Sequence, residues 1–335
     1  MSLVPIAFGF REDPHLQRTA AALEALGQSL WFMDSTTPGR CNFTSDGRNR
    51  RASIDVVDRT GSRTLSVGPD EIFVWLRNKA QYQVLRTLAT QINRFKLEER
   101  SSFIRGLIET YDIPHMNALD RGRRQEDKIL QTRFAAVAGL SMPETLISSD
   151  REEILTFLDR HPVAISKPLW VKYLPEARSG APARFIGTRK ITQDIVAQAD
   201  ADDFLIAPMI VQPLLAKQYE LRVIASRNNG AVAYKIEAPA TDQGRLDWRP
   251  VTDDCTNALV EAPQDLVDGL VRYLEAAGLE YGVFDLIMTP EDELYFLECN
   301  SDGQWAWLEP GDPPGPTARL FADILATRTR QEMYP

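Results

Sequence analysis

Three oxygen-bearing side chains in the last third of the chain have the types and spacing of a metal site. Glu298 and Asn300 follow a short apolar run, residues 294–297, that is typical of a buried strand. Alternate side chains of a strand share a face, so these two oxygen donors point the same way. Asp285 lies in a second strand-like run, residues 281–288. Because Mg²⁺ takes carboxylate oxygens together with phosphate oxygens, the three residues predict a site for a metal and a nucleotide. A single acid at a strand end can instead be solvated or cap a helix, but that interpretation does not explain all three at this spacing.

Two lysines have positions that are typical of phosphate-binding groups. Lys167 lies at the end of a strand-like run, residues 163–168, just before a proline. An ammonium group at a strand end acts as a compact charge for a phosphate. Lys128 precedes a helix rich in small residues and can serve the same nucleotide. Each lysine taken alone is also compatible with an ordinary surface position.

A short segment after an apolar strand is a candidate for contact with a nucleotide base. It consists of Gln212, Pro213, Leu214 and Leu215. Its backbone C=O and N–H groups can face an adenine ring, and a simple turn at the edge of a sheet is the alternative.

Two arginines lie at positions where the surrounding sequence makes the residue types unusual. Arg222 lies in the middle of a strand-like run, where a buried charge must be paired or functional and an exposed one would mean nothing. Arg249 ends an Asp-Trp-Arg sequence in an otherwise polar loop, where a tryptophan is unusual. The three histidines have no partners at the spacing of a metal site or a catalytic triad, and no function is assigned to them: they are His15, His115 and His161.

Composition narrows the possible classes of protein. The chain has 335 residues, enough for two or three domains, with 44% hydrophobic and 25% charged residues. Residues 1–120 carry 15 Lys and Arg against 14 Asp and Glu, whereas residues 121–335 carry 23 against 33. An acidic second half argues against general nucleic-acid binding, which needs a basic surface.

No apolar run is long enough to cross a bilayer and the N-terminus lacks the pattern of a signal peptide, so we expect a cytoplasmic protein without a membrane partner. Three cysteines are too few for a disulfide framework or a zinc cluster.

The order of the expected elements indicates an α/β architecture. The first 120 residues alternate strand-like and helix-like segments and contain no phosphate-binding glycine loop. The two strand-like runs 163–168 and 184–191 flank a Gly- and Pro-containing loop, residues 169–183, that suits a lid over phosphates. The remaining expected elements are strands at 204–215, 219–225, 231–237, 281–288 and 294–297, and helices after Lys128 to about 138, from about 149–150, at 263–279 and at 317–328.

Several short sequences occur in the order that is seen in ATP-grasp ligases. After Asn117, they are Glu126-Asp-Lys128, Pro143-Glu-Thr145, Ser166-Lys-Pro168, Val211-Gln212, Glu220-Leu-Arg222, Asp247-Trp-Arg249, Phe284-Asp285 and Glu298-Cys-Asn300. The sequence Gly303-Gln-Trp305, together with Asp-Trp-Arg, resembles more narrowly the peptide-maturing ATP-grasp ligases of the microviridin, or graspetide, type. The resemblance covers residues 113–310, and it extends only loosely to the N-terminal region. The chain departs from the family at Ser301, where proline is common, and at Pro213, where an acid often stands; neither departure removes a ligand.

The resemblance implies a fold and a set of roles. The fold class is α/β (α+β): an ATP-grasp fold with an N-terminal α/β pre-ATP-grasp domain at residues 1–118, a central and lid subdomain at 119–210 and a C-terminal catalytic subdomain at 211–335. ATP and Mg²⁺ are the expected cofactors, with the metal on Asp285, Glu298 and Asn300. Arg222 and Arg249 are the expected catalytic residues. The nucleotide is expected to contact Lys128, Lys167, Gln212, Pro213, Leu214, Leu215, Glu220 and Leu297.

The activity that the resemblance implies is ATP-dependent ligation. A side-chain carboxylate becomes an acyl phosphate, and a hydroxyl or amine displaces the phosphate to give an ester or amide crosslink in a ribosomal precursor peptide. The expected partners are that peptide, with its leader and core, and a second copy of the chain in a homodimer. No enzyme nucleophile is needed, so Cys299 is expected to be structural. The alternatives are a RimK-like ligase that joins an amino acid or amine to a protein end or a small molecule, and a non-catalytic ATP-binding protein.

Overall fold

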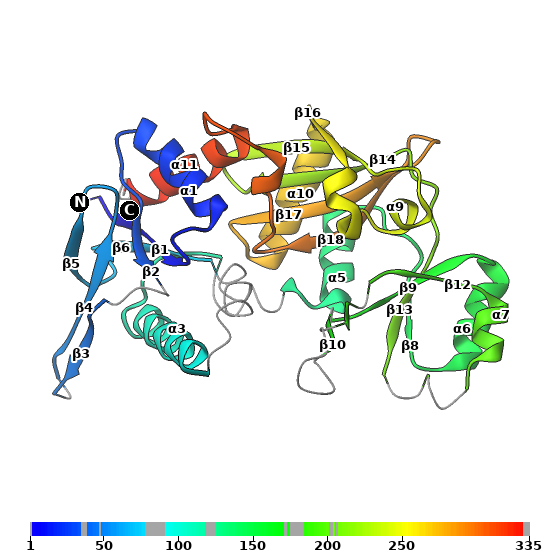
Figure 1. Ribbon diagram of the computed structural model, residues 1–335, viewed down its shortest axis with the longest axis horizontal. Helices are drawn as coiled ribbons and strands as arrows, with labels where there is room; N and C mark the ends of the chain where they lie inside the picture. The colour runs from blue at the N-terminus through cyan, green and yellow to red at the C-terminus, as the bar shows by residue number, and fades with distance from the viewer. Residues whose placement is uncertain are drawn as a thin grey trace.

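The computed structural model describes residues 2–34, 39–46, 48–77, 91–117, 125–170, 173–174, 184–185, 187–200, 204 and 207–330. In these parts of the chain three main sheets follow one another in sequence, and we name them the N-terminal, middle and C-terminal sheets. Figure 1 shows the C-terminal sheet between the other two. Loop residues 169–183, expected to form a lid, lie mostly outside the described residues, which include from them only 169–170 and the strand β10 (Tyr173–Leu174), paired with β11 (Arg184–Phe185).

The N-terminal sheet has seven strands in the order β3-β4-β2-β1-β6-β7, with β5 paired to β4. Its strands are β1 (Val4–Gly9), β2 (Trp31–Asp34), β3 (Cys41–Ser45), β4 (Arg50–Val57), β5 (Ser62–Ser66), β6 (Ile72–Leu76) and β7 (His115–Met116). The central strand β1 is parallel to β2 and β6 and is buried on both faces. Helix α1 (Pro14–Ala25) packs on one face and α3 (Gln91–Tyr111) on the other, as the alternation of Ile6 and Ala7 between two different core clusters shows.

In the described part of the chain, helices α6 (Arg151–Arg160) and α7 (Gln193–Gln198) cover one face of the middle sheet. Its strands lie in the order β12 (Arg189–Ile191), β9 (Ala164–Pro168), β13 (Met209–Pro213) and β8 (Leu146–Ser148). These two helices form a small core with Ala164 and Val211 of the sheet. In the antiparallel register Lys167 pairs with Ile210, and Gln212 pairs with Ile165. These residues therefore share the opposite face of the sheet, away from the two helices.

The C-terminal sheet has five antiparallel strands in the order β16-β15-β14-β17-β18. The strands are β14 (Tyr219–Ser226), β15 (Gly230–Glu237), β16 (Thr256–Val260), β17 (Tyr281–Met288) and β18 (Leu294–Asn300). Helices α10 (Gln264–Ala277) and α5 (Lys128–Ala138) cover one face and form a core that includes Phe284 and Cys299. The Cys299 side chain is thus buried on the face opposite the predicted metal ligands.

The N-terminal and C-terminal sheets share one hydrophobic core. Helix α11 (Pro316–Thr329), from the end of the chain, packs against α1 and against β14 and β15. Trp75 of the N-terminal sheet stacks on Phe321 of α11, at 5.1 Å between ring centroids, and Trp305 stacks on the same ring at 5.2 Å. The loop of residues 301–309 lies within this shared core, so it is held from both sides.

Helix α5 begins and ends where its sequence dictates. The Asp127 side chain accepts hydrogen bonds from the N–H groups of Ile129 and Leu130, and Gly139 ends the helix with a φ of 72°. Lys128 is therefore the first residue of the helix, and not the residue before it as the sequence predicts, because Asp127 is the cap. The expected strand at 204–215 is shorter in the structure, where β13 covers only Met209–Pro213. Among the described residues, no helix is both long and apolar enough to span a membrane.

Candidate active site

A row of polar side chains crosses three neighbouring strands of the C-terminal sheet. Arg222 of β14 lies opposite Asp285 of β17, and Asp285 lies opposite Glu298 of β18. Directly opposed residues of antiparallel strands project from the same face, so all three side chains stand on the face that is not covered by α5 and α10. This register confirms that Asp285 and Glu298 are neighbours.

A β-bulge sets the direction of the two ends of β18. Phe296 pairs with Leu286, whereas Glu298 pairs with Asp285, so Leu297 is the extra residue. Phe296 packs in the core under α10, and beyond the bulge Glu298 faces the site. A bulge changes the aim of the side chains that follow it, and here it allows one strand to supply both a core residue and a site residue.

Glu298 is the centre of the cluster. Its carboxylate, with 7% of the side chain exposed, accepts hydrogen bonds from Lys128 Nζ at 2.6 Å and from Arg249 Nη1 at 3.0 Å. The Asn300 side-chain amide donates to the same carboxylate at 3.2 Å. The structure therefore brings together residues from α5, from the start of the 3₁₀ helix η1 (Arg249–Asp254) and from β18.

Asp285 and Arg222 form the other buried ion pair of the row. Arg222 Nη1 donates to Asp285 Oδ1 at 2.6 Å, and both side chains are at most 7% exposed. Arg222 Nε and Nη2 donate to the Gln304 carbonyl at 3.1 and 2.7 Å. Burial raises the pKa of Asp285, and the nearby charge of Glu298 adds to this effect, although the charge of Arg222 opposes it.

Arg249 is held at Glu298 by a second acid. Asp247, 5% exposed, accepts hydrogen bonds from the backbone N–H of Arg249 and from its Nε at 2.9 Å. Burial lowers the pKa of Arg249, but the charges of Glu298 and Asp247 outweigh burial and raise that pKa above its ordinary value. Trp248 lies between them in sequence, and its ring lies 5.5 Å from the guanidinium carbon of Arg222. The Asp-Trp-Arg sequence thus contains one predicted catalytic residue, Arg249, and its tryptophan contacts the other, Arg222.

Lys167 brings the middle sheet to the same cluster. Burial lowers the pKa of Lys167 to about 8, and the charges of Glu298, Lys128, Arg249 and Asp247 all act on it. Such Coulomb effects require short separations. Lys167, on the free face of the middle sheet, is thus coupled electrostatically to the cluster on the free face of the C-terminal sheet.

The remaining predicted nucleotide residues lie at or near β13 and at the bulge of β18. Gln212 is buried, and its side-chain amide donates to Thr145 Oγ1 at 2.9 Å. The N–H of Leu214 donates to the Val163 carbonyl, so among the backbone groups of this segment that one is already bonded. Pro213, Leu215 and Leu297 are each half-buried.

Glu220 has a partner that the sequence interpretation missed. It lies two residues before Arg222 on β14 and is 6% exposed. Lys217 Nζ donates to Glu220 at 2.6 Å and to the Gly244 carbonyl at 3.2 Å. Burial raises the pKa of Glu220, against the opposing charge of Lys217. A lysine three residues before an acid in a loop has no distinctive spacing, so no sequence signal marks Lys217.

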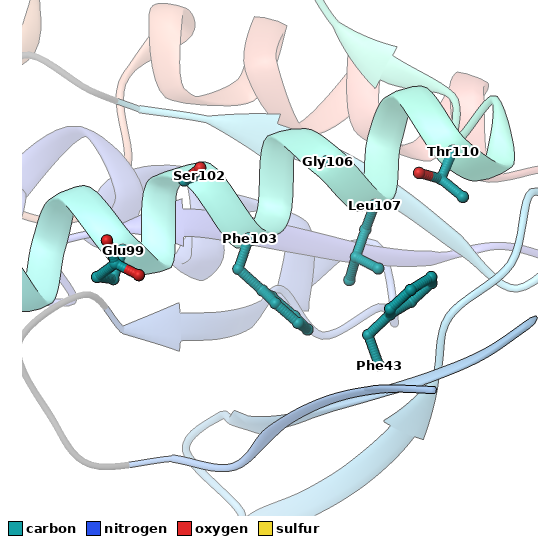
Figure 2. Close-up of a pocket in the computed structure, with 7 residues that line it drawn as sticks. All are labelled: Phe43, Glu99, Ser102, Phe103, Gly106, Leu107 and Thr110. Atoms are coloured by element: carbon teal, nitrogen blue, oxygen red, sulfur yellow. The ribbon is translucent and has the colours of Figure 1, made fainter. Parts of the chain in front are cut away.

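A separate pocket lies outside this cluster. It has a volume of about 340 Å³ and opens between β3 and α3 of the N-terminal unit (Figure 2). Figure 2 shows Phe43, Phe103 and Leu107 facing this space, with Glu99 as its acidic member. None of the predicted site residues lines it, and its lining contains no basic group, so we assign the chemistry to the cluster around Glu298.

The donor set fits a divalent cation that completes its coordination with phosphate. Among the described residues, no group of three or more His, Cys, Asp and Glu side chains is arranged to hold a metal without further ligands. Asp285 and Glu298 nevertheless lie opposite each other, and Asn300 adjoins them. Mg²⁺ characteristically takes one or two carboxylates and completes its shell with phosphate oxygens and water, which is the arrangement that these residues can supply.

The charges of the cluster favour an anionic ligand. Four cationic side chains, from Lys128, Lys167, Arg222 and Arg249, converge on two opposed carboxylates. With Asp247 beside Arg249, the cluster holds four cations and three carboxylates, and this surplus of positive charge attracts an anion. This geometry can bind phosphate groups and stabilise negative charge that develops during a transfer reaction.

Comparisons with solved structures identify the fold. The structure superposes with a TM-score of 0.78 on a RiPP-associated ATP-grasp ligase of Chryseobacterium gregarium, solved with ADP and a leader and core peptide, at 21% identity over 97% of each chain. The macrocyclase MdnC of Microcystis aeruginosa, bound to the precursor peptide MdnA, gives 0.72 at 22% identity over 96% of this chain and 99% of that one. A D-alanyl-alanine synthetase of Vibrio cholerae gives 0.57 at 13% identity over 99% and 100%.

These likenesses confirm the fold class that the sequence predicts: the chain has the ATP-grasp fold, and its N-terminal sheet is included in the match. The match covers nearly the whole of each chain. No protein-family model matches the sequence, and the comparison with curated proteins found no match either.

Proposed function

We propose that this chain is an ATP-dependent ligase that activates a side-chain carboxylate of a precursor peptide as an acyl phosphate and forms ester or amide crosslinks in that peptide. The observation that carries the proposal is the cluster itself: Glu298 opposite Asp285, with Lys128, Lys167 and Arg249 around it. The fold that carries this cluster is also found in peptide-modifying ATP-grasp ligases.

Asp285, Glu298 and Asn300 are proposed to hold Mg²⁺ beside the phosphates of ATP. The metal would neutralise charge as one anion attacks another, which is the main barrier to phosphoryl transfer. The hydrogen bonds from Lys128 and Arg249 to Glu298 keep the carboxylate in place. In the presence of the triphosphate, these two cations and Lys167 lie where they can bind its oxygens.

The two arginines are proposed to serve the second half of the reaction. Arg222 is fixed by Asp285 and by the Gln304 carbonyl, and Arg249 is fixed by Asp247. A planar guanidinium suits the acyl phosphate and the oxyanion of the tetrahedral intermediate. Because both arginines are immobilised before substrate enters, they can stabilise that charge with little reorganisation.

The nucleotide base is proposed to lie between the middle and C-terminal sheets. Gln212 lies on the free face of the middle sheet, Pro213 ends β13, Leu214 and Leu215 follow it, and Leu297 lies at the bulge of β18. Glu220, held by Lys217, is proposed to contact the nucleotide. The division into domains at residues 118 and 210, the homodimer and the cytoplasmic location stay predictions.

A ribosomal precursor peptide with a leader and a core is the proposed partner. The structures of the Chryseobacterium ligase and of MdnC are complexes with such peptides. A leader that binds separately raises the effective concentration of the core at the site, so one active site can process several side chains in turn.

The test is mass spectrometry of an acidic candidate precursor after incubation with the enzyme, ATP and Mg²⁺. We expect a loss of about 18 Da per crosslink, because each ester or amide forms with net removal of one water. Reversal by hydroxylamine or base indicates esters, and resistance indicates amides. A mass gain of one amino acid would refute the macrocyclase reading and support the RimK-like alternative. Nucleotide binding without phosphate release when a carboxylate substrate is added would favour a non-catalytic nucleotide-binding protein.

A further inference from the structure

Three buried polar side chains of the N-terminal unit converge on the loop that follows β18. They are Asp13, His15 and Arg77, whose exposed fractions are 0%, 3% and 0%. Asp13 and His15 lie at the start of α1, and Arg77 follows β6. Buried charged groups are rare in proteins unless they are paired. None of the three lies in the cluster around Glu298, so their role needs a separate explanation.

Their contacts with the loop follow one another along the chain. Arg77 Nη1 pairs with the Asp302 carboxylate, and Arg77 Nη2 donates to the Gly303 carbonyl at 3.3 Å. The N–H of Trp305 donates to His15 Nε2 at 2.9 Å. The residue between these contacts, Gln304, turns its carbonyl the other way, to the guanidinium of Arg222.

Asp13 joins the two other side chains into one unit. Its Oδ1 accepts from the His15 backbone N–H at 2.9 Å and lies 2.6 Å from His15 Nδ1. Its Oδ2 accepts from Arg77 Nε at 3.3 Å. Because His15 Nε2 accepts a hydrogen bond from Trp305, the imidazole proton is on Nδ1 and is donated to Asp13. Burial and the charge of Arg77 lower the pKa of His15, which agrees with a neutral ring.

The loop has little freedom to move between these anchors. A Cβ atom at Gly303 would lie 2.5 Å from the Cβ of Val283, so only glycine fits against β17 here. The Trp305 ring packs edge-on to His15 at 5.0 Å and stacks on Phe321. Upstream, the Asn117 side chain donates to the Ser301 carbonyl at 2.9 Å. The position of the Gln304 carbonyl is thus determined by groups on both sides of it.

We propose that Asp13, His15 and Arg77 are positioning residues of the ligase: they hold the loop 302–305 so that the Gln304 carbonyl orients the guanidinium of Arg222. This inference rests on the function proposed above, and it assigns a catalytic purpose to the N-terminal unit. Arg222 has two anchors, Asp285 and Gln304. When the second is displaced, the fork of Arg222 is tethered only by Asp285 and turns away from the reacting carboxyl group.

The substitution His15→Leu tests this, because it removes the acceptor for the Trp305 N–H and puts an apolar side chain of similar size in place of the imidazole. We expect kcat for ADP formation to fall about 10- to 100-fold, as is usual when a residue that orients a functional group is lost, with the KM for ATP within about twofold of its normal value. His15→Gln places an amide oxygen near the position of Nε2 and should restore most of the activity. His161→Leu is the matched control, since His161 contacts Glu144 outside the cluster, and it should leave kcat unchanged.

A double-mutant cycle separates positioning from general destabilisation. A lysine at position 222 cannot make the forked contact with the Gln304 carbonyl, so the effect of His15→Leu should shrink to less than about twofold in an Arg222→Lys background. An equal loss in both backgrounds would overturn the proposal, as would full activity of His15→Leu.

Hydrogen exchange supplies a readout that does not depend on activity. Exchange across residues 301–306 should accelerate in His15→Leu and remain slow in His15→Gln, since only the first variant frees the Trp305 N–H. If the wild-type protein forms no ADP, the proposed function fails, whereas unchanged exchange in His15→Leu overturns the positioning role itself.

Discussion

Removal of the Glu298 charge is the sharpest perturbation of the proposed site. Glu298→Gln retains the shape of the side chain and an oxygen that can accept from Arg249. It leaves Lys128, 2.6 Å away in the wild-type protein, without a carboxylate. At that separation the Coulomb attraction is about 6 kcal/mol for an effective dielectric constant of about 20. Most of this attraction offsets the cost of desolvating the two ions.

The expected loss of stability follows from that balance. Removal of one partner of a buried ion pair typically costs about 3–5 kcal/mol, and the lower end applies because the amide still accepts from Arg249. A loss of about 3 kcal/mol corresponds to a fall in Tm of about 6–12 °C for a unit of this size. The loss of a metal-ligand charge should also lower kcat at least about 100-fold, which is about 2.7 kcal/mol in the barrier.

The assays are thermal melting followed by circular dichroism and carboxylate-dependent ADP formation at saturating ATP, each over a titration of Mg²⁺. Glu275→Gln is the matched control: Glu275 is an exposed acid on α10, which covers the opposite face of the C-terminal sheet. The control should melt and turn over as the wild type does. A normal kcat in Glu298→Gln would refute the assignment of Glu298 as a metal ligand. If the Tm were lowered while kcat stayed normal, Glu298 would be a purely structural member of an ion pair.

Three further predictions concern neighbouring groups. Arg222→Lys and Arg249→Lys keep the charge but lose the planar guanidinium group. Product formation should therefore fall more than tenfold, while ATP affinity, measured by calorimetry, stays within about threefold of the wild-type value. A variant that loses only ATP affinity would place the substituted arginine in the nucleotide site. Because burial lowers the pKa of Lys167 to about 8, its ammonium is lost as the pH rises past 8, and ATP affinity should weaken between pH 7 and pH 9, whereas Lys167→Arg, which stays charged, should show a flat profile. Gly303→Ala forces a Cβ against Val283, so it should lower the free energy of unfolding by about 1–3 kcal/mol and also reduce activity. The additional change Val283→Ala should recover part of both. Unchanged melting of Gly303→Ala would mean that the loop does not pack as described.

The sequence predicts the ligands of the cluster better than their partners. The face shared by Glu298 and Asn300 follows from the two-residue period of a strand, and the structure has this arrangement, with Cys299 buried on the other side. The pairing of Arg222 with Asp285 does not follow from either strand, because register between strands 63 residues apart depends on the whole sheet. The bulge at Leu297 is equally hidden, since nothing in its local sequence differs from a regular strand.

The histidines show why local spacing was insufficient. His15 has no partner at a recognisable spacing except Asp13, and a neighbouring acid at the start of a helix is usually only a cap. Its functional contact is with the Trp305 N–H, 290 residues away. Backbone groups leave no mark in a sequence pattern, so an interaction between a side chain and a distant backbone group is visible only in the structure.

The same argument explains the Gly-Gln-Trp sequence at residues 303–305. Each residue meets a different demand: Gly303 leaves room for Val283, the Gln304 carbonyl faces Arg222, and the Trp305 ring fills the core shared by α1 and α11. Only the last demand involves a side chain of a particular chemistry. The cluster around Glu298 and the N-terminal unit therefore meet through backbone groups of one short loop, and we expect a substitution in α1 to alter the orientation of Arg222 without touching any residue proposed to bind the nucleotide.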